Sequence, residues 1–307
     1  MMALFRKFMV LALGLAVCSA TPWQAAQASW NAGNFLKFGI GARAMGMGNS
    51  FVAVADDATA VYWNPAGLTQ LEENQVFMSY AERFGAGIQD QSLGVALKWR
   101  ERVNVGFAVV RTSVGDIKHT TEGVVDSRGR PIVDGTFDDA EVGLLFSSGV
   151  RVHEIFSIGL TAKYMIHDLA DKTATGMGLD IGWLFRPLES LTFGLNTQNI
   201  NRTRMKWSTE GSHFDRIPAN FKFGGALDLL DSKMKVSADV NLPDFGSVGL
   251  NSGIEYRLTD YLVMRGGMER AELATGASIN VERIHIDYAY RSQELGDTHR
   301  FALSYGF

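Results

Sequence analysis

A period-two alternation recurs from residue 74 to the end of this chain, and it is the feature that most limits the possible folds. The last such segment, residues 300–307, reads RFALSYGF, so large apolar residues alternate with small or polar ones. Successive side chains of a β-strand point to opposite faces, so each segment has one apolar face and one small or polar face. About fourteen such segments occur, and most are about ten to thirteen residues long. Tilted transmembrane strands need about that length, whereas strands of soluble proteins are usually nearer five or six residues.

The expected strands cover most of the chain after residue 74. They begin near Asn74, Asp90, Arg102, Asp139, Glu154, Thr175, Ser190, Pro218, Lys233, Ser247, Tyr261, Glu272, Arg283 and Asp297. No later segment is an uninterrupted apolar run of 18 residues, so we expect no transmembrane helix. A membrane protein without helices must be a closed barrel, because unpaired backbone groups are too costly in lipid. We therefore predict an all-β transmembrane antiparallel barrel of about 14 strands, covering residues 74–307.

The connections between these strands sort by length. The long ones are residues 113–138, 167–174, 201–217 and 292–296, and all are odd-numbered counting from the first strand. The even-numbered ones are tight turns. Outer-membrane barrels have short periplasmic turns and longer outside loops. This arrangement predicts that both chain ends lie in the periplasm.

A soluble β-sandwich or soluble barrel would also alternate, with its apolar face as the core. Here the second face is rich in small residues, which suits a narrow lumen better than a solvated exterior. Aromatic residues also lie near the strand ends, as in the girdles of membrane barrels. These are Tyr80, Trp99, Tyr164, Phe185, Tyr256, Tyr261 and Tyr290.

The N-terminus has the pattern of a secretory signal peptide. Two basic residues precede the apolar run 8–17, and a small-x-small cleavage site ends at Ala28. We expect residues 1–28 to be removed, with a retained anchor or lipidation at Cys18 as the alternatives. Cys18 is the only cysteine, so no disulfide is expected, and loss of the leader takes the net charge from −4 to −6. That charge does not favour nucleic acid as a partner.

Residues 29–73 are expected to form a compact plug inside the barrel. Within them residues 39–68 read GIGARAMGMGNSFVAVADDATAVYWNPAGL, which is rich in Gly and Ala and lets a backbone lie close to its surroundings. Residues 58–63 can form one or two helical turns, with Asp57 as the cap. Asn64 and Pro65 then stop the helix, because the residue before a proline is pushed out of the helical region.

This glycine-rich stretch resembles the N-terminal signature of the PorV/PorQ family, within the larger group of FadL-like outer-membrane barrels. In FadL-like proteins an Asn-Pro-Ala motif lies in a plug, or hatch, and it matches Asn64, Pro65 and Ala66 here. The resemblance implies a passive conduit for hydrophobic small molecules such as long-chain fatty acids, gated by plug movement. The gating residues would then be Asn64, Pro65, Ala66, Gly67, Asp56, Asp57 and Arg43.

The PorV branch implies a different role, as a scaffold or shuttle in type IX protein secretion. Its partners would be secretion-system proteins, outer-membrane lipid and lipopolysaccharide. The terminal Phe307 resembles the signal that barrels present to the outer-membrane assembly machinery. An open, water-filled porin is the third alternative, and a plug with a small-residue lumen argues against it.

We find no pattern of a catalytic, cofactor or metal site. The six histidines are scattered without the spacing of a zinc site. Ser278, His285 and Asp287 lie on neighbouring strands, but a polar lumen produces such sets by chance, so the protein is not expected to be an enzyme. The pair Asp56 and Asp57 either binds a cation or, as we favour, caps a helix and pairs with Arg43.

Two loops are candidates for contacts outside the barrel. Residues 113–138 form either a mobile or hairpin-like partner-binding excursion or an ordinary solvated loop. Residues 201–217 carry Arg202, Arg204, Lys206 and Trp207. This basic and aromatic loop either contacts lipopolysaccharide phosphates or an acidic ligand headgroup, or anchors the barrel at the membrane interface.

Overall fold

The computed structural model describes residues 33–209, 213–244 and 247–307 of the chain. The expected signal peptide, residues 1–28, and Cys18 within it lie outside the described residues.

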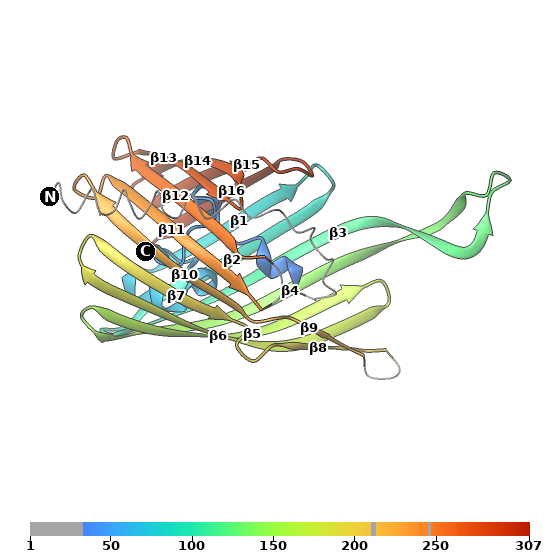
Figure 1. The fold of residues 1–307 in the computed structure, drawn as a ribbon, viewed down its shortest axis with the longest axis horizontal. Helices are drawn as coiled ribbons and strands as arrows, with labels where there is room; N and C mark the ends of the chain where they lie inside the picture. The colour runs from blue at the N-terminus through green and yellow to red at the C-terminus, as the bar shows by residue number, and fades with distance from the viewer. Residues whose placement is uncertain (1–32, 210–212, 245–246) are drawn as a thin grey trace.

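Fourteen strands form a closed antiparallel barrel (Figure 1). They are β1 (Gln75–Arg83), β2 (Ile88–Arg100), β3 (Val103–Val125), β4 (Pro131–His153), β5 (Phe156–Leu169), β6 (Lys172–Leu188), β7 (Leu191–Gln198), β10 (Asn220–Leu229), β11 (Met234–Pro243), β12 (Gly249–Arg257), β13 (Leu262–Glu269), β14 (Glu272–Val281), β15 (Ile284–Arg291) and β16 (Thr298–Gly306). Strand β1 pairs with β16, and β5 with β6, which closes the sheet. Two short strands, β8 (Arg204–Trp207) and β9 (Phe214–Arg216), form a hairpin that pairs with β6. The predicted fold class, a barrel of about 14 strands around a small plug, is confirmed.

Two of the predicted long connections are shorter than expected, because the strands continue through them. Residues 113–138 take the hairpin-like form that the sequence left open: β3 and β4 extend as a paired ribbon as far as Val125 and Pro131. Figure 1 shows this ribbon projecting well beyond the barrel. Residues 167–174 are likewise the ends of β5 and β6, which pair as far as Leu169 and Lys172 around a short turn. Outside the bilayer both strand faces meet water, so the apolar alternation fades although the backbone pairing continues.

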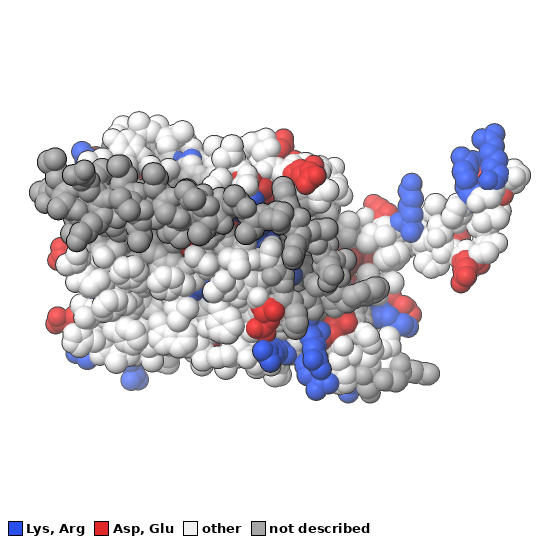
Figure 2. All heavy atoms as spheres, viewed as in Figure 1, with Lys and Arg blue, Asp and Glu red and all other residues white. Residues whose placement is uncertain are grey.

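Large apolar side chains point outward from the barrel wall. Examples are Leu93 (60% exposed), Met177 (70%) and Phe301 (56%). Between its two ends the face seen in Figure 2 carries few charged side chains. Such a broad apolar surface is what lipid requires of a spanning barrel, and a soluble barrel would bury it. Among the described residues no helix is long and apolar enough to cross a bilayer.

The plug consists of the described residues before β1 and lies inside the barrel (Figure 1). Its short helices are η1 (Asn34–Lys37), α2 (Ala42–Gly46), α3 (Ala60–Trp63) and η2 (Pro65–Gln70). Helix α3 ends as predicted, because Asn64 before Pro65 is extended (φ −164°, ψ 108°). After α2 the chain turns at Gly48 (φ +60°), whose side-chain position would collide with the backbone of Met268 on the wall.

The interior of the barrel is filled by plug side chains packed against small wall residues. Phe51 and Tyr62 make edge contacts with the Trp63 ring, with ring centroids 6.0 Å and 5.0 Å away. Trp63 Nε1 donates to the Ile40 carbonyl at 3.1 Å. The largest fully buried apolar side chains of the plug are Trp63, Phe51, Met45, Met47 and Leu68. The core of this protein is therefore the contact between the plug and the wall.

Candidate functional site: a plug held by the barrel wall

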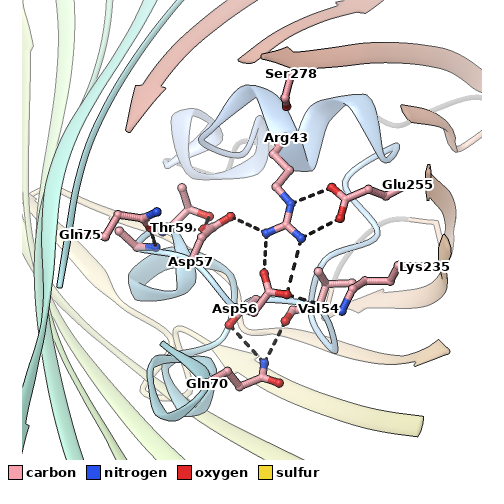
Figure 3. Close-up of polar contacts among 12 residues, drawn as sticks. Arg43, Val54, Asp56, Asp57, Thr59, Gln70, Gln75, Lys235, Glu255 and Ser278 are labelled. Atoms are coloured by element: carbon pink, nitrogen blue, oxygen red, sulfur yellow. Dashed lines mark hydrogen bonds and ion pairs between the residues drawn. The ribbon is translucent and has the colours of Figure 1, made fainter. Parts of the chain in front are cut away.

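Arg43 is the centre of the charged contact between plug and wall (Figure 3). It lies in α2 and its guanidinium meets carboxylates from three positions. Nη1 donates to Asp56 Oδ1 at 2.5 Å and to Asp57 Oδ2 at 3.0 Å. Nε and Nη2 form a two-pronged contact with Glu255 of β12, at 2.8 Å and 2.9 Å. Paired guanidinium–carboxylate contacts fix direction as well as charge, so α2 is held at one orientation against β12.

Wall residues extend this cluster around the lumen. Arg265 of β13 donates from Nε to Glu255 Oε2 at 2.6 Å, so one carboxylate serves a plug cation and a wall cation. The Arg265 Nη1 atom lies 3.1 Å from Asp287 Oδ1. Lys235 Nζ lies 3.5 Å from Asp56 Oδ2 on the opposite side. The partly buried charges therefore compensate one another across the plug–wall boundary.

The pKa values of the two plug carboxylates, Asp56 and Asp57, shift in opposite directions. Burial raises the pKa of Asp57, and the neighbouring Asp56 charge adds to that effect against Arg43. Burial also acts to raise the pKa of Asp56, but the charges of Arg43 and Lys235 outweigh it and leave that pKa lowered. Arg43 pairs with both carboxylates, as the favoured salt-bridge interpretation predicts. The predicted cap at Asp57 is wrong, because α3 begins at Ala60 and its N-cap is Thr59, without a side-chain cap hydrogen bond. Asp57 Oδ1 accepts from the Thr59 backbone N–H at 2.9 Å, just before α3.

Asn64 ties the plug to the opposite wall and has no exposed surface. Its Nδ2 donates to the Val52 carbonyl at 2.8 Å and to the Trp183 carbonyl of β6 at 3.1 Å. Its Oδ1 accepts from Ala66 N at 3.2 Å, which caps η2. One amide thus joins two plug segments and one wall strand.

Pro65 and Ala66 lie against wall positions that have no side chain. A Cβ atom at Gly149 would lie 2.6 Å from the Pro65 carbonyl oxygen, and one at Gly159 or Gly182 would collide with the same stretch. Gly67 itself could not carry a Cβ, because the Ala55 carbonyl occupies that space. Wall glycines of this kind occur around the barrel, at Gly106, Gly149, Gly159, Gly182, Gly194, Gly253 and Gly267.

Sequence reasoning missed several residues of this site. Glu255 of β12 and Arg265 of β13 point into the lumen, on strands whose side chains alternate between lumen and lipid. The wall glycines also occupy lumen-facing positions of their strands. Asp239 of β11 was also missed: its Oδ2 accepts from the backbone N–H groups of Phe51 and Val52, at 2.7 Å and 3.0 Å. A charge or glycine on the lumen face of a strand was the available signal.

The suspected Ser–His–Asp set is not assembled as a catalytic relay. The Ser278 hydroxyl hydrogen-bonds to Asp287 and Arg265, whereas His285 Nδ1 pairs with Asn280 Oδ1 at 2.8 Å. No group of three or more metal-ligating side chains occurs in the part of the chain that the structure describes.

The predicted loop residues lie apart from the plug cluster. Trp207 Nε1 donates to Asp215 Oδ2 at 2.6 Å, and its ring packs on His167 with centroids 5.1 Å apart. Arg202 pairs with Asp244 at 2.9 Å. Arg204 stacks over the Phe214 ring at 4.5 Å. Lys206 is exposed on β8.

Known structures with this architecture are outer-membrane barrels of FadL-like fold. The Ralstonia pickettii toluene transporter TbuX has a TM-score of 0.65 and 14% identity, over 88% of this chain and 98% of that chain. The CymD monoaromatic hydrocarbon channel has a TM-score of 0.64 at 13% identity, over 88% and 98%. A Pseudomonas aeruginosa FadL homologue has a TM-score of 0.60 at 14% identity, over 87% and 98%. At this level of sequence identity, these similarities establish the fold of the chain and do not identify a transported molecule.

Residues 23–245 match the family described as Type IX secretion system protein PorV, which is most of the chain. The chain belongs to the PorV family. It is an outer-membrane β-barrel of a diderm bacterium, in a non-enzymatic family. No curated protein matches it.

Proposed function

We propose that this protein is a scaffold of type IX secretion, in which a closed, plugged barrel carries a ribbon that binds secretion partners. The observation that carries the proposal is the contrast between an immobilised plug and an exposed β3–β4 ribbon. Family membership supports the secretion role.

The plug is held on several sides at once. Arg43 pairs with Glu255, Asn64 donates to Trp183, and Asp239 accepts from the plug backbone. Moving the plug would break these contacts together and leave charged groups without partners, which is costly. The arrangement favours a barrel that works with its plug in place.

The ribbon has the properties of a binding element. Val124, Val125, Ile132 and Val133 are 43–51% exposed on it. An isolated two-stranded ribbon is marginally stable in water, and its unpaired edges accept a further strand. We infer that a secretion partner covers this ribbon, with strand addition along an edge as the mode of contact.

We also propose the orientation and the division of the chain. The ribbon end would face outside, and the end with the shorter turns and Phe307 would face the periplasm, where Phe307 would be read by the assembly machinery. Residues 1–28 would be the removed signal peptide, 29–73 the plug and 74–307 the barrel.

A passive conduit for hydrophobic molecules is the second candidate. Its support is the fold shared with structures described as a toluene transporter and a monoaromatic hydrocarbon channel. It requires the plug contacts above to open, and Asn64, Pro65, Ala66, Gly67, Asp56, Asp57 and Arg43 would then be the gating residues.

Deletion of residues 116–137 tests the scaffold. It joins Gly115 to Asp138 as a two-residue turn between Val114 and Asp139, which are already paired. A Gly-first two-residue turn suits a hairpin. We expect a folded barrel, shown by its heat-dependent gel mobility, that no longer co-purifies secretion-system proteins. Unchanged co-purification would contradict the proposal, and selective enrichment of an apolar molecule with the full-length protein would favour the conduit.

A further inference from the structure

A second surface, on the described residues of the β8–β9 hairpin, gathers positively charged side chains that form no ion pair with their neighbours in the described chain. Arg204 is directly opposite Arg216 in the hairpin register, and Lys206 is opposite Phe214. Alternation places Arg204, Lys206, Arg216 and Phe214 on one face, which we call the basic hairpin face. All four of these residues are exposed, and Figure 2 shows basic side chains together over this region at the lower right.

No acidic group balances this face within the described residues. None of its three cations forms an ion pair with a residue in 33–209, 213–244 or 247–307. Asp215 belongs to the other face, where its carboxylate binds Trp207 Nε1 and His213 Nε2 at 2.6 Å and 3.1 Å. Like charges directly opposite each other destabilise a strand pair, so Arg204 opposite Arg216 weakens the hairpin unless an anion lies between them.

The hairpin is nevertheless fixed in place from behind. Met205 is 2% exposed and belongs to the apolar core. It packs where Gly176 of β6 leaves room for it. The Arg204 guanidinium stacks 4.5 Å above the Phe214 ring, which limits its motion. Met205 therefore anchors β8 to the barrel, and the ring contact restrains Arg204, which lowers the entropy that this side chain loses on binding.

The height of this face on the barrel identifies its surroundings. Lys206 pairs with Thr175 of β6, and Met177 two residues further along β6 is 70% exposed. Two strand residues span about 7 Å along a tilted strand, which is about 5 Å along the barrel axis. The basic hairpin face thus begins one step beyond the outward apolar belt. Lipid phosphates lie at that level of a membrane.

We propose that the basic hairpin face binds the phosphate groups of glycolipid headgroups in the outer leaflet. Arginine forks match phosphate oxygens with paired hydrogen bonds, and an anion between Arg204 and Arg216 removes their repulsion. The assignment to the outer leaflet rests on the proposed function, in which the ribbon end of the barrel faces the outside of the cell. The site is separate from the ribbon and the plug, and it gives the barrel a fixed lipid contact beside its mouth.

The test is native mass spectrometry of the full-length barrel with a phosphorylated lipid A and with the same glycolipid after enzymatic dephosphorylation. The wild-type protein should retain the phosphorylated form selectively. The double variant Arg204→Gln/Arg216→Gln should lose about tenfold in retention, because two charge-assisted contacts are removed. The matched control Arg128→Gln/Arg130→Gln removes the same charge at the ribbon tip and should retain lipid as the wild type does.

Equal retention by the two double variants, with both barrels folded by gel mobility, would overturn the proposal. So would equal retention of the dephosphorylated glycolipid by the wild type. Inorganic phosphate alone is the third arm. If it displaces the lipid completely at modest excess, the face is a free-phosphate site and the lipid assignment fails.

Discussion

The plug meets the wall in two different ways, on opposite sides of the lumen. Against β4, β5 and β6, residues 64–67 are held by shape, through wall glycines and the uncharged hydrogen bonds of Asn64. Against β12 and β13, shape is supplemented by the Arg43–Glu255–Arg265 charges. Close backbone packing therefore positions the plug in the lumen, whereas the ion pairs of Arg43 fix the orientation of α2. Substitutions on the first side should therefore cost more than substitutions on the second.

The largest expected effect is at a wall glycine. In Gly159→Ala the new methyl group would occupy the space of the Pro65 and Ala66 backbone, which has no flexible end to move aside. We expect a loss of about 3 kcal/mol or more, or failure to fold with the plug inserted, by the overpacking argument. The measurement is the denaturant midpoint of the heat-modifiable barrel band. Gly225→Ala is the matched control, because its nearest atoms beyond its chain neighbours are 3.6 Å away on Phe193. Equal denaturant midpoints for the two variants would contradict the claim that close packing against wall glycines holds the plug on this side.

A smaller effect is expected from Asn64→Ala/Pro65→Ala. The double variant leaves the Val52 and Trp183 carbonyls without their amide donor and removes the helix stop. We expect a loss of about 2 kcal/mol and a loosened plug. Protease access to residues 39–73 and leak of small solutes both report on it. If protease access and solute leak both stay at the wild-type level, the Asn64 hydrogen bond to β6 does not hold the plug in place.

The smallest effect is expected from Arg43→Met on the charged side. It leaves Asp56, Asp57 and Glu255 without Arg43, but Lys235 still pairs with Asp56 and Arg265 still pairs with Glu255. We expect a loss of about 1–2 kcal/mol. Adding Glu255→Gln should recover part of it, because one unpaired carboxylate is removed. The check is a double-mutant cycle on the denaturant midpoint, and strict additivity of the two substitutions would mean that Arg43 and Glu255 are not coupled.

Much of this architecture follows from local sequence. Alternation over residues 300–307 and its counterparts predicts the strands, since a period of two is visible without partners. The turn at Asn64 and Pro65 and the pairing of Arg43 with Asp56 and Asp57 also involve residues close in sequence.

The remaining features depend on contacts between distant segments. Arg43 and Glu255 are 212 residues apart. Alternation shows that Glu255 faces the lumen, but not at what height, because height depends on strand tilt and register. For the same reason, the contact between the lumen-facing Gly159 and Pro65 of the plug cannot be predicted from the sequence. The sequence does not show how far β3 and β4 extend into the ribbon, because strands with water on both faces lose their apolar period.

A disulfide between plug and wall tests the central claim most directly. Thr69 Oγ1 of η2 and Ser157 Oγ of β5 are 2.9 Å apart, so Thr69→Cys/Ser157→Cys places two sulfurs within bonding reach. Cys18, in the expected leader, is the only other cysteine, so the bond forms without competition once the leader is removed. Recovery of secretion-system proteins would be compared for the oxidised and reduced forms of this variant. A scaffold that works with its plug in place predicts equal recovery in both forms. Loss of recovery on oxidation, restored by reduction, would show that the plug must move and would contradict the claim.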